Sequence, residues 1–146
     1  MVGSSRRERT RILVLSSADL ARDWAAEIRA EFLVEILEPP RPGLIMSQVR
    51  ETARRSVFHL GEVLVTECKV RVAGTPGLGI VRGWNDSMAE NLAIIDAACR
   101  GALPVAERWN GRLAEALAAL EARLTRERVL LEATRVDFQT MDTGTP

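Results

Sequence analysis

Few side chains in this 146-residue chain are suited to catalysis: it has one histidine, His59, and two cysteines, Cys68 and Cys99. A nucleophilic triad would use His59 as its base, but no Gly-x-Ser-x-Gly motif offers a serine nucleophile. The histidine and the separated cysteines also lack the spacing of metal ligands, so the sequence predicts no metal site. We expect the cysteines to pack as small apolar side chains and His59 to have a structural or surface role, with a place near a substrate as the alternative.

A run of glycines, Gly74, Gly77, Gly79 and Gly83, is the second feature that could bind a ligand. A phosphate-binding P-loop needs a lysine directly after its last glycine, whereas the only lysine, Lys69, precedes the run. A dinucleotide-binding loop needs glycines that open a helix, and these lie in a turn and a strand. The pattern therefore favours a hairpin whose backbone packs closely against another element.

The charged residues limit the class of ligand. The 20 basic residues balance 20 acidic ones, and this neutral sum argues against a nucleic-acid binder. All basic residues except Lys69 are arginines, which bind carboxylates and phosphates in two-pronged geometry; a GC-rich genome would produce the same bias. Among the arginines, Arg82 and Arg135 are candidates for a place near a substrate.

The apolar segment nearest the N-terminus, residues 12–15, is far too short for a signal peptide or a membrane span. The two cysteines do not form the framework of a secreted, disulfide-rich protein. We therefore expect a cytoplasmic protein that binds no membrane.

The apolar pattern predicts one domain over residues 1–146, with residues 1–5 disordered. A basic segment that runs into apolar residues predicts a short helix over 6–15. A second helix is expected to begin at Ser16, which can cap it, and to end near Phe32. Its inward face carries apolar residues at intervals of four: Leu20, Trp24 and Ile28.

The middle of the chain has strand patterns. Pro39, Pro40 and Pro42 cannot donate to a sheet ladder, so we expect the first strand to end before them. The clearest alternation, over 63–73, places charged residues on a solvated face and five residues on a core face: Leu64, Thr66, Cys68, Val70 and Val72. The expected extended segments are 33–37, 44–52, 57–60 (which ends at Gly61), 63–73 and 79–84.

The last third of the chain is helical. Ser87 and Glu90 form a capping box that predicts a helix ending at Gly101, and Pro104 is expected to begin the next one. An apolar stripe then indicates a long helix that lies on its own domain or docks on a partner subunit: Trp109, Leu113, Leu117, Leu120, Leu124 and Leu131. The fold expected is α+β, an antiparallel β-meander sheet flanked by N-terminal helices and a long C-terminal helical segment.

Three stretches carry a resemblance to a known family. They are FHLGE at 58–62 continuing into VTECKV at 65–70, GWND at 83–86 followed by AENLAIIDA at 89–97, and ATRVDFQTM at 133–141. In this order, and in a chain of this length, they resemble PhnG, a small subunit of the bacterial carbon–phosphorus lyase core complex. The likeness covers most of the chain, and the third stretch is the most specific.

The resemblance implies phosphonate catabolism in a complex with PhnH-, PhnI- and PhnJ-type core subunits and a PhnL-type ATP-binding-cassette protein. Its first step would displace adenine from ATP by an alkylphosphonate, giving a ribose 1-alkylphosphonate 5-triphosphate. ATP is then a substrate of the complex, and no cofactor is expected in this chain. An iron–sulfur cluster and S-adenosylmethionine are expected on the PhnJ-type subunit. The chain would be an accessory subunit that does not catalyse alone and that self-associates or dissolves poorly in isolation.

The third stretch contains the predicted partner interface, which comprises Val136, Asp137, Phe138, Thr140 and Met141. A tail with such apolar residues is expected to be covered by this domain or by another chain. The stretch departs from the family pattern at Gln139, where a second aromatic is common, and at 142–144, where the family tends to carry Val-Arg-Gly. For Arg135, the expected partners are Asp137, a carboxylate of another subunit or a phosphate.

Two other functions stay open on the residues alone. One is a free-standing hydrolase or isomerase for a small anionic metabolite, using His59, Glu62 and Arg82. The other is a purely structural adaptor with no part near a substrate.

Overall fold

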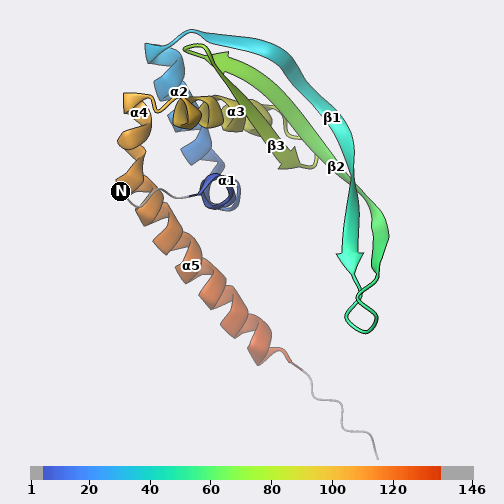
Figure 1. The fold of residues 1–146 in the computed structure, drawn as a ribbon. Helices are drawn as coiled ribbons and strands as arrows, with labels where there is room; N and C mark the ends of the chain where they lie inside the picture. The colour runs from blue at the N-terminus through green and yellow to red at the C-terminus, as the bar shows by residue number, and fades with distance from the viewer. Residues whose placement is uncertain (1–4, 136–146) are drawn as a thin grey trace, which may run out of the picture.

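The computed structural model describes residues 5–135. These residues form one three-stranded antiparallel sheet, in which β2 lies between β1 and β3, and five helices (Figure 1). The predicted α+β meander, flanked by N-terminal helices and a long C-terminal helix, is confirmed. The elements in chain order are α1 (Arg6–Leu15), α2 (Ala18–Glu31), β1 (Val34–Arg50), β2 (Val57–Val72), β3 (Thr75–Arg82), α3 (Asp86–Arg100), α4 (Pro104–Glu107) and α5 (Trp109–Ala133).

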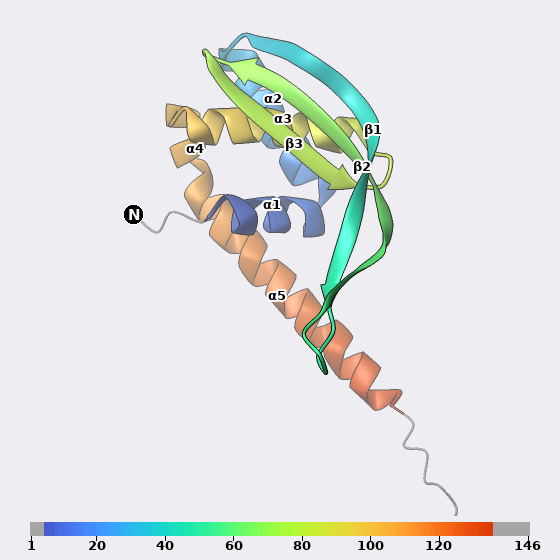
Figure 2. The ribbon, with the colours of Figure 1, turned by 45° about the vertical axis from the view of Figure 1, so that its right-hand side comes forward.

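Helix α3 is the centre of the core. It packs against β3 and β2 and also contacts α2 and α1, so the sheet curves over it (Figure 1 and Figure 2). The inner face of β2 is fully buried, as its alternation predicts, at Thr66, Cys68, Val70 and Val72. Leu64 is exposed instead, because it lies beyond the last residue of β2 that pairs with β3.

The glycines of β3 let its backbone lie directly on α3. A Cβ atom on Gly77 would overlap the carbonyl oxygen of Ala93, and one on Gly79 would overlap that of Ala89. The alanines of α3 present small side chains to the same contact. The predicted hairpin with close backbone packing is therefore confirmed, and these glycines serve packing.

Strand β1 continues through the three prolines, so the predicted end before Pro39 is wrong. β1 is an edge strand, and its register with β2 shifts between Ile36 and Glu38 and again between Glu38 and Arg41. A proline is tolerated on an edge strand or at a bulge because no ladder hydrogen bond is then lost. The predicted segments 33–37 and 44–52 are thus parts of one bent strand.

Two further boundaries differ from the prediction. β2 does not break at Gly61; a register shift there, with Ser47 opposite Gly61 and Gln48 opposite His59, absorbs one residue. β3 begins at Thr75, four residues before the predicted start. The tight turn lies at Ala73 and Gly74, where φ is 47° and 81°, and these positive values suit a two-residue hairpin.

The helix boundaries are mostly as predicted. Gly101 is the C-cap of α3, and Pro104 occupies the first turn of α4. The N-caps differ: Ser17, not Ser16, caps α2, and Asn85, not Ser87, caps α3.

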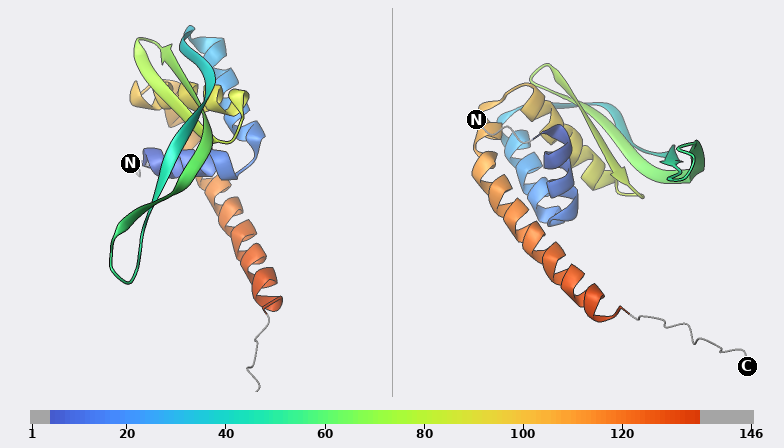
Figure 3. Two further views of the ribbon diagram at one scale, coloured as in Figure 1. Left: turned by 90° about the vertical axis from the view of Figure 1, so that its right-hand side faces the viewer. Right: turned by 60° about the horizontal axis from the view of Figure 1, so that its bottom comes forward.

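Helix α5 packs only its first half onto the body. Its Trp109 ring stacks on Trp24 of α2, with centroids 4.6 Å apart and planes 7° from parallel, and Leu113 and Leu120 are buried. Beyond them α5 extends away from the sheet (Figure 3), and Leu131 is 71% exposed. The predicted apolar stripe is therefore covered at its start and open at its end.

Candidate functional site

The three residues predicted to lie near a substrate sit on three different elements. His59 is exposed on β2 opposite Gln48, Arg82 is exposed at the end of β3 opposite Val65, and Arg135 is exposed just past α5. Six residues of extended strand separate His59 from Val65, which is roughly 20 Å at the rise of a β-strand. The structure does not bring His59 and Arg82 together.

The predicted partner interface, Val136, Asp137, Phe138, Thr140 and Met141, lies outside the described residues. Within 5–135, no group of three or more histidine, cysteine, aspartate or glutamate side chains is placed to hold a metal ion. The helices of this range include none that is long and apolar enough to cross a membrane.

The cysteines are free and packed inward. Cys68 is buried on β2 and Cys99 is half-buried on α3. Burial, together with the charge of Glu90, raises the pKa of the Cys68 thiol to about 11, and burial raises the pKa of Cys99 as well. A thiol with a raised pKa is a poor nucleophile at neutral pH. Cys68 therefore acts as the small core side chain that its position in the strand predicts.

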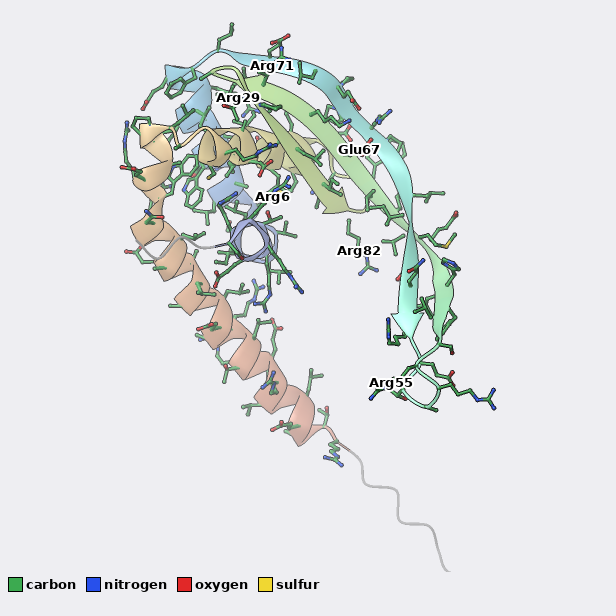
Figure 4. The ribbon with its side chains drawn as sticks, in the orientation of Figure 1. Arg6, Arg29, Arg55, Glu67, Arg71 and Arg82 are labelled. Carbon is green, nitrogen blue, oxygen red and sulfur yellow. The ribbon has the colours of Figure 1, made fainter. Side chains whose placement is uncertain are left out.

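Ion pairs cover the outer face of the sheet and join β1 to β2. Glu35 pairs with Arg71 at 2.9 Å and Glu38 with Lys69 at 2.6 Å. Arg41 bridges Glu38 and Glu67, and Figure 4 shows Glu67 and Arg71 on this outer face. The solvated face expected from the alternation is confirmed, and its charged side chains bind one another.

The buried carboxylate of Asp96 on α3 binds groups from two other elements, β3 and α1. It accepts the backbone N–H of Leu78 on β3 at 3.1 Å, and it pairs with Arg6 of α1 at 2.8 Å. Arg9 of α1 lies 3.7 Å from the same carboxylate. The cluster fastens α1 to the core. An aspartate inside the apolar run LAIIDAA at 92–98 was the sequence signal for it, and the sequence reasoning did not use that signal.

Two of the stretches that carry the family resemblance meet at Thr66. Its buried hydroxyl donates to the carbonyl oxygen of Gly83 at 2.7 Å and accepts the N–H of Asn85 at 3.0 Å. Asn85 in turn caps α3 by accepting the N–H of Met88. Thr66 therefore fixes the GWND loop at the start of the central helix, a role that the sequence pattern did not reveal.

Several arginines have side chains without a hydrogen bond or ion pair within the described part of the chain. They lie on α1, at the end of β3, on α5 and around the turn between β1 and β2. They are Arg7, Arg11, Arg50, Arg54, Arg55, Arg82, Arg126 and Arg128. The charges of these side chains are therefore not neutralised by a carboxylate of the described residues.

The residues 43–64, which we call the arm, form a two-stranded ribbon from the ends of β1 and β2 with their connecting turn. The arm projects from the body in Figure 1 and Figure 3. Its exposed apolar side chains make it an uncovered surface of the described chain. A contiguous exposed apolar surface is typical of an interaction site.

Comparison with known proteins identifies one family for this chain. The model of the family described as "Phosphonate metabolism protein PhnG" matches residues 4–144. Comparison with individually curated proteins gave no match. Because the family model spans nearly the whole sequence, the chain belongs to the PhnG family of phosphonate metabolism proteins.

Proposed function

We propose that this chain is an accessory subunit of a carbon–phosphorus lyase core complex. It acts with PhnH-, PhnI- and PhnJ-type subunits and a PhnL-type ATP-binding-cassette protein. Family membership over residues 4–144 is the observation that carries the proposal.

The proposed reaction transfers a ribose 5-triphosphate group from adenine to an alkylphosphonate. A phosphonate oxygen bonds to the ribose C1′ atom while the bond from C1′ to adenine breaks, and adenine leaves with a proton. The product is a ribose 1-alkylphosphonate 5-triphosphate. The proposed use of ATP as a substrate supports a cytoplasmic location.

The exposed end of α5 supports a subunit role. Val129, Leu130 and Leu131 are three consecutive exposed apolar residues there. Successive residues on a helix point in different directions, so this segment is apolar around much of its circumference. Burial of these apolar side chains against another chain is favourable. We expect α5 to contact a partner subunit beyond Leu120.

The donor set of this chain supports placing the iron–sulfur cluster on a partner. Such a cluster takes about four cysteine thiolates, whereas the whole sequence has two cysteines. Both have raised thiol pKa values, which disfavours the thiolate form that binds iron. The cluster and S-adenosylmethionine therefore belong to the PhnJ-type subunit in this proposal.

Reconstitution tests the proposal. The chain is co-expressed with the PhnH-, PhnI- and PhnJ-type subunits, combined with the PhnL-type protein, and supplied with ATP and methylphosphonate; adenine release is measured by chromatography. We expect release by the full set and none by this chain alone or by the set without it. Turnover by the isolated chain that His59→Ala abolishes would support a free-standing enzyme instead. Full release by the set without this chain would contradict the proposal.

A further inference from the structure

The arm is a part of the described chain that the body leaves uncovered. β3 pairs with β2 only over residues 65–72, so the arm keeps two strands where the body has three. Figure 1 and Figure 3 show no helix lying against it. A two-stranded ribbon is marginally stable by itself in water. A partner that covers the arm would stabilise it.

Apolar side chains occupy both faces of the arm. Leu44 pairs with Leu64 across the ribbon and the next residue, Ile45, pairs with Val63; neighbouring strand residues point to opposite faces. Leu44 is 63% exposed and Leu60 is 66% exposed. The exposed apolar residues of the arm are Leu44, Ile45, Met46, Val49, Val57, Phe58, Leu60 and Leu64.

The tip of the arm is basic. Glu51 closes the turn, since its N–H donates to the Ser56 carbonyl oxygen at 2.9 Å and its carboxylate accepts the Ser56 hydroxyl at 3.0 Å. Arg50, Arg54 and Arg55 flank this turn and have no carboxylate partner among the described residues. Figure 4 shows Arg55 at the tip of the arm.

We propose that the arm inserts into an apolar cleft of a different protein chain, whose carboxylates receive the arginines at its tip. The inference rests on the proposed function, because the partner it requires is another subunit of the phosphonate complex. The cleft contacts both faces of the ribbon, so it has two apolar walls. Its acidic groups lie at the far end of the cleft, where Arg50, Arg54 and Arg55 arrive.

Charge favours a different chain over a second copy. Ten of the 18 carboxylates in the described part of this chain pair with its own arginines or lysine, so fewer than half of them are left for the arginines of a second copy. The apolar pattern favours a protein over a membrane, since a segment that lies on a lipid surface buries one face. It also argues against nucleic acid, whose backbone would require basic residues along the arm and not only at its tip.

Two double variants test the arm. Leu44→Ser with Leu60→Ser removes apolar contact from its length, and Arg50→Glu with Arg54→Glu reverses charge at its tip. Each tagged full-length variant is co-expressed with the PhnH-, PhnI- and PhnJ-type subunits, and its affinity for them is measured after purification. We expect each double variant to bind at least about tenfold more weakly, since buried apolar and arginine contacts dominate interface affinity.

Matched controls lie outside the arm. Leu33→Ser changes a leucine that is 88% exposed, and Arg7→Glu reverses an arginine of α1 that has no partner in the described chain. Both are expected to bind within about twofold of wild type. Circular dichroism checks that each variant is folded. Hydrogen exchange of the wild-type complex gives a second test without substitution: the amides of residues 57–64 should exchange more slowly in the complex than in the free chain.

The outcomes distinguish a failure of the arm inference from a failure of the proposed function. If wild type binds the subunits and the arm variants bind equally well, or the amides of 57–64 gain no protection, the arm inference is wrong while the accessory role stands. If wild type binds none of the subunits, the proposed function itself fails. A wild-type homodimer that the arm variants convert to a monomer would assign the arm to a second copy. Arm-dependent binding to vesicles that contain phosphatidylserine would assign it to a membrane. Both results would overturn the inference.

Discussion

The carboxylate of Asp96 accepts a hydrogen bond from the backbone N–H of Leu78, which lies on the outer edge of β3, at 3.1 Å. Arg6, which pairs with Asp96, also donates to the carbonyl oxygen of Leu78 at 3.4 Å. Side chains of α1 and α3 thus occupy a point on the sheet edge where another strand could pair. Closing an edge in this way removes a site for unwanted strand pairing.

Asp96→Ala is expected to lower the free energy of unfolding by about 2 to 3 kcal/mol. The substitution leaves the N–H of Leu78 without its acceptor in a part-buried position, and it removes the partner of Arg6. Most of the loss is assigned to the N–H, because the Arg6 side chain is 54% exposed and its ion pair is weakened by solvent. Urea unfolding measures the change.

Glu35→Ala is the control for Asp96→Ala. It removes an exposed ion pair with Arg71 on the outer face of the sheet, and we expect a loss of no more than about 1 kcal/mol. Equal losses in the two variants would show that Asp96 contributes no more to stability than an exposed ion pair, which would contradict its role in closing the edge of β3.

Gly79→Ala is expected to destabilise the protein by about 2 to 3 kcal/mol, since the new Cβ would overlap the backbone of α3 at Ala89 and push β3 off its helix. Gly111→Ala is the matched substitution in α5, where no atom lies within 4 Å of the new Cβ. It should stabilise the protein by about 0.5 to 1 kcal/mol through helix propensity. Thermal unfolding tests whether Gly79→Ala lowers the stability of the protein while Gly111→Ala raises it.

Local chemistry made much of the fold predictable. Gly101 and Pro104 mark helix boundaries by their own backbone preferences, and the alternation of β2 separates its core face from its charged face. The prolines of β1 misled the prediction, because their cost depends on whether the strand lies at an edge. Strand order depends on the whole sheet, so the proline-rich segment alone does not show whether its strand lies at an edge.

The proposed docking surface, the arm, was less predictable because its exposure depends on where neighbouring elements end. The apolar residues of the arm read as ordinary strand residues, and only the end of β3 opposite Val65 leaves them uncovered. The cap of α3 shows the same limit: Ser87 fits the local pattern, but Thr66 holds the N–H of Asn85 from a distant strand and sets the helix start there. The sequence suggested one site for His59 and Arg82, but the two residues lie far apart along the sheet.

Glu27 should make stability depend on acid pH. Burial raises the pKa of its carboxyl, but hydrogen bonds from Trp109 and Arg112 and the charges of Arg112 and Arg108 outweigh burial, so the pKa lies below its ordinary value of 4.5. A carboxyl whose pKa is lower in the folded state stabilises the protein above its unfolded pKa and loses this contribution as pH falls through the folded pKa. From about pH 6 to about pH 3, Glu27→Gln should therefore lose less unfolding free energy than wild type.

Urea unfolding at a series of pH values checks the effect of Glu27→Gln. Glu115→Gln is the control, because the Glu115 side chain has no ion pair or hydrogen bond in the described chain; its profile should run parallel to that of wild type. A Glu27→Gln profile that is also parallel to wild type would mean that Trp109 and Arg112 do not hold this carboxylate.

Arg82→Ala tests whether the free end of β3 lies near the chemistry of the complex. Arg82 is exposed, projects beyond the end of β3 (Figure 4) and has no ion pair in the described chain. Its loss should therefore change the free energy of unfolding by no more than about 0.5 kcal/mol. We expect the variant to assemble with the other subunits as wild type does and to release adenine from ATP and methylphosphonate more slowly, because an arginine that lacks an internal partner is available to an anionic substrate.

Arg7→Ala is the matched control for Arg82→Ala, since it removes an arginine of α1 that also lacks a partner in the described chain. Comparing adenine release at saturating and limiting methylphosphonate separates a weaker hold on substrate from a slower reaction. If Arg82→Ala reduces assembly and release together, the end of β3 is a subunit contact. If both stay at wild-type levels, Arg82 has no role near the substrate, and the search for the anion-binding group moves to Arg135 and the partner chains.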